Sequence, residues 1–326
     1  MADTWKDSQP VGHCSTRLLD AETAVAVTSP APPAKPAGPW SIVLGTPESG
    51  RGPTPQMAAL AALGTCSIAQ LHGVAGIKGL EVSAITVDMR LLGRAGTDAL
   101  AVEKHVHVTG DLDKRAIRML ENAANFCPVS QYFSGTGILM ETTVNWGDDD
   151  TGLAVDSPPP REVGFPEGDL QEHGTVSCRL VGSYQSLVTV DEVTPAGSRT
   201  HRFIIDEGPP KGGGSGMSPT KLVMAALSGD TALALAPVLT KFGVPPDALT
   251  ITAHNTRPVA PGGDSQQQRI DGWASGQRFK IPASQDIAIS ASLPSEAVPL
   301  LREAVESSAI RGFFAGLSIR ENFTFD

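Results

Sequence analysis

The sequence predicts an α+β protein made of two similar halves, and three observations support this. The chain has 326 residues, which is enough for two domains of about 150 residues each. Hydrophobic residues make up 40% of it, enough to fill real cores. Segments in which apolar and polar residues alternate, as in strands, stand beside Ala/Leu-rich segments typical of helices, and the settings of two cysteines recur in the second half.

The first half begins after a polar stretch, residues 1–20, that we expect to be a flexible lead-in. Alternation predicts strands at 23–28 and 40–45. The Pro-rich segment between these strands suits neither a strand interior nor a helix, so it is expected to be a stiff connection. An Ala/Leu-rich helix then follows from about 54 to 74.

Two long strands, at about 80–92 and 99–109, come after this helix. A second helix is expected to start at Asp111, because acidic residues in a first turn interact favourably with the helix dipole. It runs to about residue 124. A strand at 138–146 then closes the first domain.

The predicted domains are residues 21–146 and 174–326, joined by a linker at 147–173 that is rich in Asp, Pro and Gly. In the second domain, strands are expected at 174–187 and 201–206. A Gly-rich loop then leads into a third helix. This loop lacks the Gly-Lys-Ser/Thr of a phosphate-binding loop, so we interpret it as a flexible connection. A long polar loop is expected later in this domain, at 258–268.

The repeat is clearest around two cysteines. Residues 53–66, which end at Cys66, align with residues 217–230, which end at Asp230. Around the second cysteine, Cys127 aligns with Ser308, and the apolar and glycine positions that follow also match. The chain is therefore predicted to be a tandem protein whose second copy lacks both cysteines.

This pattern resembles the OsmC/Ohr superfamily. The features that carry the resemblance are a Pro-containing helix entry, a helix with Gly-x-Cys, and a later Cys-Pro-Val-Ser before a Gly-containing turn and a strand. It covers residues 20–145 directly and 174–326 through the repeat. It implies α+β domains with sheets wrapped around central helices. Because the family forms intertwined homodimers, this chain is expected to pack its two halves as an intramolecular pseudo-dimer.

The resemblance also implies thiol-dependent reduction of organic hydroperoxides. Cys66 would be the peroxidatic cysteine, which attacks the peroxide and becomes a sulfenic acid. Cys127 would be the resolving cysteine, which captures that sulfenic acid as a disulfide, and an external thiol would then reduce the disulfide. The reactive sulfur must be a thiolate, which requires a positive neighbour.

Two further residues of the family site are a glutamate and an arginine. The glutamate position, ten residues before Cys66, holds Gln56, and the repeat has Thr220 there. An amide cannot form the ion pair that orients the arginine, although its oxygen can accept a weaker hydrogen bond. Arg51, just before the first long helix, is our preferred arginine. The other candidates are Arg17, Arg199 and Arg202.

The missing glutamate leaves two alternatives open. One is a diverged enzyme of the same fold, a lyase, cyclase or hydrolase that acts on a small apolar metabolite. It would use Cys66 or Asp230, because a buried Asp has a raised pKa and can act as an acid or base. A hydrogen-bonded structural role for Asp230 is the simpler interpretation. The other alternative is a non-catalytic protein that binds an apolar ligand between the two halves.

Composition limits the partners. The formal net charge of −10 argues against nucleic-acid binding. We expect no membrane span, because no apolar run approaches the roughly 20 residues required. The first residues lack a basic and then apolar signal region, and a reducing cytoplasmic setting fits best.

No metal or cofactor is expected. The four cysteines lack the close spacing of a zinc site or a disulfide scaffold. His105 and His107 share one strand face, but no third ligand is evident. The expected partners are a small apolar or peroxide substrate and a thiol reductant. The expected state is a monomer acting as a pseudo-dimer, with further dimerisation left open.

Overall fold

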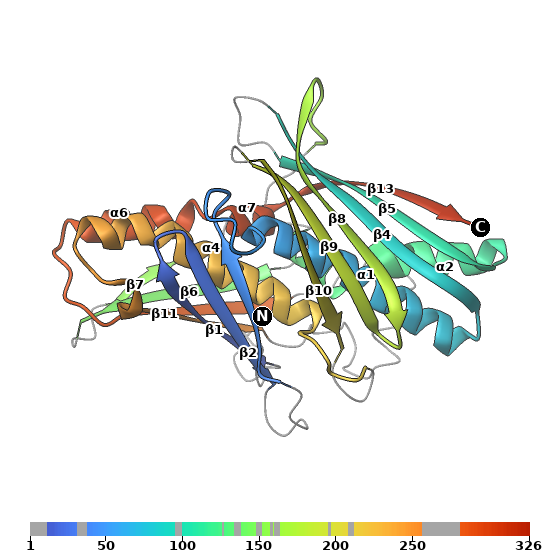
Figure 1. The fold of residues 1–326 in the computed structure, drawn as a ribbon, viewed down its shortest axis with the longest axis horizontal. Coiled ribbons are helices and arrows are strands. Elements are labelled where there is room, and N and C mark those ends of the chain that lie inside the picture. The colour runs from blue at the N-terminus through green and yellow to red at the C-terminus, as the bar shows by residue number, and fades with distance from the viewer. Residues whose placement is uncertain are drawn as a thin grey trace.

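The computed structural model confirms a mixed α/β architecture with two sheets and six α-helices among the described residues (Figure 1). Helices α1 and α4 pack against each other between the two sheets. Helix α1 contacts one sheet and α4 contacts the other. The residues described are 12–30, 38–94, 100–125, 127–133, 138–147, 152–156, 159, 164–194, 197–207, 212–255 and 281–326.

Helix α1, Pro55–Lys78, is the centre of the first core. Its N-cap is Thr54, whose side chain accepts a hydrogen bond from the N–H of Met57. Pro55 starts the helix without losing a hydrogen bond, and Gly79 ends it in the left-handed conformation (φ 66°). Helix α4, Pro219–Lys241, also starts at a proline.

Each sheet contains strands from both halves of the sequence. Antiparallel pairing of β4 with β8 joins the halves in the six-stranded sheet, and pairing of β1 with β11 joins them in the seven-stranded sheet. Neither half forms its sheets alone. The six-stranded order is β10 (Gly197–Asp206), β9 (Gln185–Thr194), β8 (Leu170–Gly182), β4 (Glu81–Arg94), β5 (Leu100–Asp111) and β13 (Ser318–Phe325). The seven-stranded order is β3 (Trp40–Gly45), β2 (Thr23–Pro30), β1 (Gly12–Asp20), β11 (Leu249–Asn255), β12 (Ile281–Ile289), β6 (Ile138–Trp146) and β7 (Gly152–Val155).

The short helices complete the core. Helices α3 and α7 pack together through aromatic rings, with Tyr132 and Phe314 centroids 5.1 Å apart. Such aromatic pairs add stability beyond the area they bury. The bounds of the remaining helical elements are α2 (Lys114–Asn125), α3 (Pro128–Phe133), η2 (Pro246–Ala248), α6 (Ala297–Glu306) and α7 (Ala309–Ala315).

The prediction that residues 1–20 form a flexible lead-in was wrong for residues 12–20, which form strand β1. Small polar side chains hide the alternation of this strand. Thr16 points inward, where its hydroxyl lies 2.6 Å from that of Ser228 on α4. A buried hydroxyl of this kind is tolerated because it is hydrogen-bonded.

Other observed boundaries of helices and strands also differ from the predicted ones. The second helix starts at Lys114 rather than Asp111, because β5 runs on to Asp111, and Asp113 accepts a hydrogen bond from the N–H of Ala116 at 2.7 Å. The expected strand at 174–187 is two strands, since the chain turns at Tyr184 (φ 58°). The expected linker contains β7 and the start of β8. The expected loop at 258–268 lies outside the described residues.

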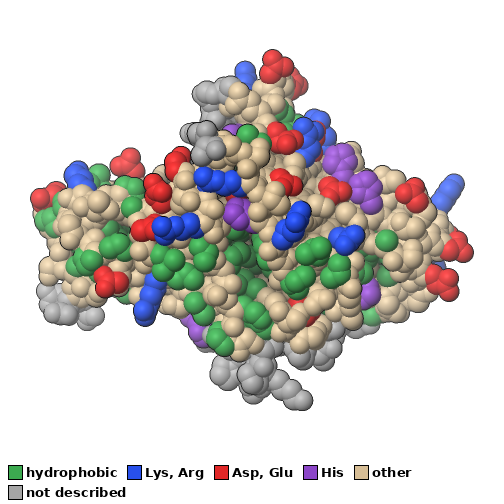
Figure 2. Space-filling model, viewed as in Figure 1, with side chains coloured by type: hydrophobic (Ala, Val, Ile, Leu, Met, Phe, Trp, Pro, Cys, Tyr) green, Lys and Arg blue, Asp and Glu red, His purple; other side chains and the backbone are tan. Residues whose placement is uncertain are grey.

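The expectation that no apolar run is long enough to span a membrane was also wrong. Helices α1 and α4 pass that test by length and composition, with hydropathies of 1.4 and 1.7. In each, 78% of the most apolar window is buried inside the protein. On the face shown in Figure 2, basic and acidic side chains are interspersed.

Candidate functional site

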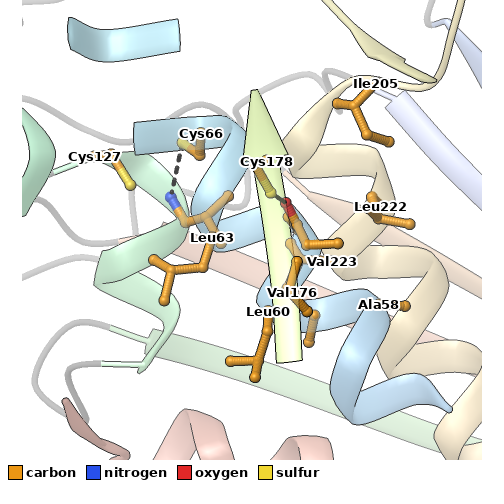
Figure 3. Packing of buried hydrophobic residues seen from close by; sticks show 14 of the residues in the cluster. Ala58, Leu60, Leu63, Cys66, Cys127, Val176, Cys178, Ile205, Leu222 and Val223 are labelled. Atoms are coloured by element: carbon orange, nitrogen blue, oxygen red, sulfur yellow. Dashed lines mark hydrogen bonds between the residues drawn. The ribbon is translucent and has the colours of Figure 1, made fainter. Parts of the chain in front are cut away.

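The structure brings Cys66 and Cys127 together in the core (Figure 3). Cys66 lies in the middle of α1 and Cys127 immediately before α3, and both are free thiols with 2% and 0% exposure. The Cys66 sulfur accepts a hydrogen bond from the N–H of Val129 at 3.5 Å. The N–H of Ser130 donates to the Cys127 sulfur at 3.3 Å. Each thiol is close enough to shift the pKa of the other.

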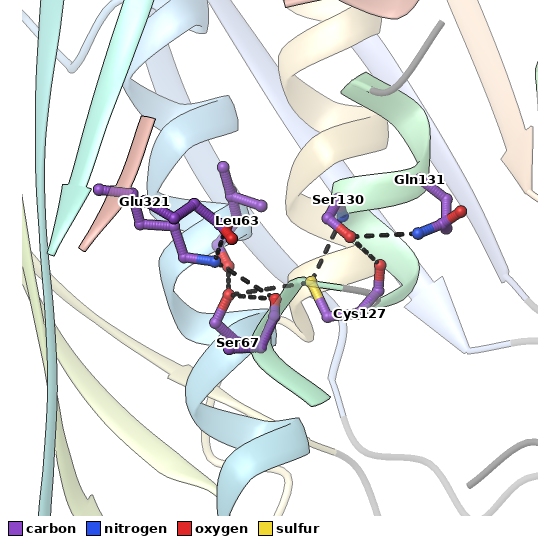
Figure 4. Close-up of polar contacts among 8 residues, drawn as sticks. Leu63, Ser67, Cys127, Ser130, Gln131 and Glu321 are labelled. Carbon is purple, nitrogen blue, oxygen red and sulfur yellow. Dashed lines mark hydrogen bonds and ion pairs between the residues drawn. The ribbon is translucent and has the colours of Figure 1, made fainter. Parts of the chain in front are cut away.

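A buried lysine supplies the positive charge beside this pair. The side chain of Lys104, on β5, is fully buried, and its ammonium group pairs with Glu321 of β13 at 2.8 Å. The same ammonium donates to the carbonyl of Ala124 at 3.2 Å. Ser67, on α1, has its hydroxyl 3.9 Å from the Cys127 sulfur (Figure 4).

These contacts shift the pKa values of the two thiols in opposite directions. Burial alone would raise the pKa of Cys127, but the neighbouring Cys66 side chain, the charge of Lys104 and the N–H of Ser130 together lower it to about 6. Burial raises the pKa of Cys66 well above its ordinary value, and its contact with Cys127 raises it further. These shifts favour the thiolate form of Cys127 and the protonated form of Cys66.

Tyr132 belongs to the same buried apolar cluster as the two cysteines. Its hydroxyl is buried without a hydrogen-bond partner among the described residues. Burial raises the pKa of Tyr132, the nearby Asn255 side chain opposes that rise, and a charge on Cys66 would add to it. The hydroxyl thus stays protonated in the core.

Residues 47–143 match the family model of OsmC-like proteins. This segment belongs to the OsmC-like family. It includes both Cys66 and Cys127, so the resemblance expected from their pattern is confirmed. Searches of the curated proteins and of the solved structures found no match.

The structure does not bring Gln56 or Arg51 to the thiols of the OsmC-like segment. Gln56 lies on α1 ten residues before Cys66, about 15 Å along the helix axis. It lines a pocket that also contains Asp230 and Ser308. The Arg51 side chain is 63% exposed and pairs with Asp20 at 2.6 Å. Neither residue can contact the buried sulfur of Cys66.

The other candidate arginines also lie elsewhere. Arg17 and Arg202 are exposed. Arg199 donates hydrogen bonds to the backbone carbonyls of Pro47 and Glu48. Among these candidate cations and Lys104, it is Lys104 whose charge acts on Cys127.

Sequence reasoning missed Lys104, although the sequence carries a signal for it. In the alternating strand β5, Lys104 occupies an inward position between two buried valines, Val102 and Val106. A lysine on the apolar face of a strand is rarely buried unless it is paired. Tyr132 has no comparable signal, because nothing in the sequence distinguishes it from the other aromatic residues expected in the core.

The second half repeats one feature of the OsmC-like site with different chemistry. Asp230, on α4, accepts a hydrogen bond from the N–H of Ile310 at 2.9 Å, and Ile310 follows Ser308 by two residues as Val129 follows Cys127. Burial raises the pKa of Asp230, while the N–H groups of α7 and the Ser308 side chain oppose the rise. A carboxyl group thus occupies the place of the thiol.

Proposed function

We propose that this protein reduces organic hydroperoxides with the buried Cys66–Cys127 pair, and that its two halves form an intramolecular pseudo-dimer. The observation that carries the proposal is the placement of Cys66 and Cys127 together in the core, with the buried ammonium of Lys104 acting on Cys127. This arrangement supports a thiolate at neutral pH, which is the form that attacks peroxides. Sheets built from strands of both halves support the pseudo-dimer.

In the first step, the Cys127 thiolate attacks the distal oxygen of the hydroperoxide. An S–O bond forms, the O–O bond breaks, and the alkoxide leaves as an alcohol after it takes up a proton. The Tyr132 hydroxyl donates a hydrogen bond to the leaving oxygen. The product is a sulfenic acid at Cys127 and one alcohol.

In the second step, the Cys66 sulfur attacks the Cys127 sulfur. An S–S bond forms, the S–O bond breaks, and the hydroxyl leaves as water with the proton of Cys66. The pair has then given two electrons to the peroxide, and an external thiol restores both cysteines. This order of attack is the reverse of the one that the family resemblance implies, because the charge of Lys104 acts on Cys127.

The surroundings of the pair favour an organic peroxide over hydrogen peroxide. Cys66 and Cys127 belong to the larger apolar core cluster, together with Val129 and Phe133. An apolar group on the substrate gains free energy from entering such a site, whereas hydrogen peroxide does not.

The test is to mix the reduced protein with cumene hydroperoxide or hydrogen peroxide and to follow disulfide formation by intact mass. Fast formation of one intramolecular disulfide with the organic peroxide is expected. Cys66→Ser should stop at a sulfenic acid that dimedone traps at Cys127, and Cys127→Ser should be unreactive. Cys178→Ser is the matched control, because Cys178 is also buried but lies outside the pair.

Two other outcomes are informative. A sulfenic acid trapped at Cys66 in the Cys127→Ser variant, with none at Cys127, would restore the order that the family implies. Thiols that ignore both peroxides would overturn the peroxidase proposal.

The second candidate is a different function centred on Asp230, either as a diverged enzyme or as a ligand-binding protein. One observation favours it: the pocket that contains Gln56 opens at Asp230 rather than at the thiols.

A further inference from the structure

Asp230 lies in a pocket rather than in a fully packed core. The pocket has a volume of about 270 Å³ and lies between the start of α1, the middle of α4 and the residues that precede α7. Asp230 is 8% exposed, and its Oδ2 accepts the hydrogen bond from Ile310. A small molecule can therefore reach a carboxyl group that is almost buried.

This carboxyl group has no cationic partner in the pocket. The described residues that line it include no lysine, arginine or histidine. Arg311, the buried arginine of α7, is engaged elsewhere: it donates to the hydroxyl of Thr142 at 2.9 Å and to the backbone carbonyl of Asp156. An unpaired buried carboxylate is costly, and a ligand that brings its own cation removes that cost.

A second observation points to a ligand at the same place. The hydroxyl of Ser308 lines this pocket and is buried without a hydrogen-bond partner, and Ser308 as a whole is only 4% exposed. Although the hydroxyl is close enough to influence the Asp230 carboxyl, it does not meet the geometry of a hydrogen bond to it. Its oxygen is therefore available as an acceptor beside the carboxylate.

These groups suit an ammonium ion better than a metal ion. An ammonium group has three N–H donors, and the pocket offers oxygen acceptors from Asp230, Ser308 and the partly exposed Gln56. A metal site would need more anionic or imidazole ligands, and among the described residues no group of three or more His, Cys, Asp and Glu could hold a metal ion.

A neighbouring hollow could hold the apolar part of such a ligand. A second hollow of about 250 Å³ shares Thr54 and Gln56 with the first and is lined by apolar side chains that include Met57, Leu91 and Val193. Its one carboxylate, Glu192, is already used, because it accepts hydrogen bonds from the N–H of Thr54 at 3.0 Å and its hydroxyl at 2.6 Å.

We propose that the Asp230 pocket binds a small primary amine, with the ammonium group at Asp230 and Ser308 and an apolar group directed toward Met57. This site has no cysteine and does not depend on the thiol cycle. It assigns a ligand class to the half of the chain in which both cysteine positions are replaced.

The test is isothermal titration of the full-length reduced protein with benzylammonium chloride, and with benzyl alcohol as the neutral analogue of similar shape. Benzylammonium should bind at least about tenfold more tightly than the alcohol, because its hydrogen bond to a carboxylate is charge-assisted. Asp230→Asn should remove that preference. Asp247→Asn, at an exposed site, is the matched control and should keep it.

Leu233→Trp is a second variant that keeps the carboxylate. Leu233 is partly exposed and lines the pocket, so a larger side chain there should fill it and block benzylammonium. Circular dichroism would verify that each variant folds. Equal affinity for amine and alcohol, unchanged binding in Asp230→Asn, or no binding to the parent protein would each overturn the proposal.

Discussion

The backbone N–H of Val129 donates a hydrogen bond to the sulfur of Cys66 at 3.5 Å. The second half has the same relationship between Ile310 and Asp230, at 2.9 Å. In both cases a long central helix presents an acceptor to the first turn of a short helix. One backbone arrangement thus supports a thiol in one half of the molecule and a carboxyl group in the other.

Removal of the buried ammonium should slow the thiol reaction. In Lys104→Met the pKa of Cys127 should rise, because its cationic neighbour is lost, and the rate of disulfide formation at neutral pH should fall about tenfold or more. The rate is measured by stopped-flow mixing with cumene hydroperoxide. Lys114→Met, at an exposed site on α2, is the control and should react normally.

The lysine variant leaves Glu321 without its partner, which itself destabilises the fold. The double variant Lys104→Met with Glu321→Gln removes both charges and should recover stability but not rate. If the double variant reacts as fast as the parent protein, Lys104 has no role in activating Cys127.

The rate of the thiol reaction should depend on pH through the ionisation of the Cys127 thiol. Because its pKa is lowered to about 6, the rate should be low below that pH, rise through it and level off above it. The same shift affects stability: a lowered pKa stabilises the folded state at high pH, and this stabilisation is lost as the pH falls through 6.

Single-turnover rates between acid and mildly alkaline pH check this profile, with urea unfolding of the parent and of Cys127→Ser over the same range. The stability difference between the two proteins should grow as the pH rises. A rate midpoint near the ordinary value for a cysteine would contradict the lowered pKa.

Gly64 should not tolerate a side chain. A Cβ at this position of α1 would lie 2.6 Å from the Met89 methyl carbon and 2.8 Å from the Cys178 sulfur. We expect Gly64→Ala to lower the free energy of unfolding by about 1–3 kcal/mol, because the gain in helix propensity is smaller than the cost of overpacking.

Gly76 lies on the same helix and provides the comparison. A Cβ there meets nothing within 4 Å, so Gly76→Ala should stabilise the protein by about 0.5–1 kcal/mol. Urea unfolding of both variants at one pH measures the difference. Equal effects at the two glycines would show that the strands do not pack closely on α1 at Gly64.

Arg51→Ala should leave peroxide reduction unchanged. Its guanidinium group is exposed and paired with Asp20, away from the thiols, and exposed ion pairs contribute little stability. The rate with cumene hydroperoxide and the urea midpoint should both match those of the parent protein. A large loss of rate would mean that the guanidinium moves to the thiols during the reaction.

Local signals account for the parts of the fold that the sequence predicted well. Strands β3 and β6 were predicted at their observed bounds, because alternation and flanking turns define them without reference to neighbours. The prediction of β1 failed because its inward Thr16 depends on a hydroxyl partner from α4, 212 residues away in the chain. Only contacts between distant segments reveal such a strand.

The sequence by itself determined the resemblance of residues 47–143 to OsmC-like proteins and the mixed α/β class, because short motifs and periodicity carry that information. The tertiary structure decided which residues share a site. Packing of α1 against α4 puts Gln56 beside Asp230 instead of Cys66. Pairing of β5 with the C-terminal strand joins Lys104 to Glu321 beside Cys127. These neighbours come from segments far apart in the chain, and only the packing of both halves brings them together.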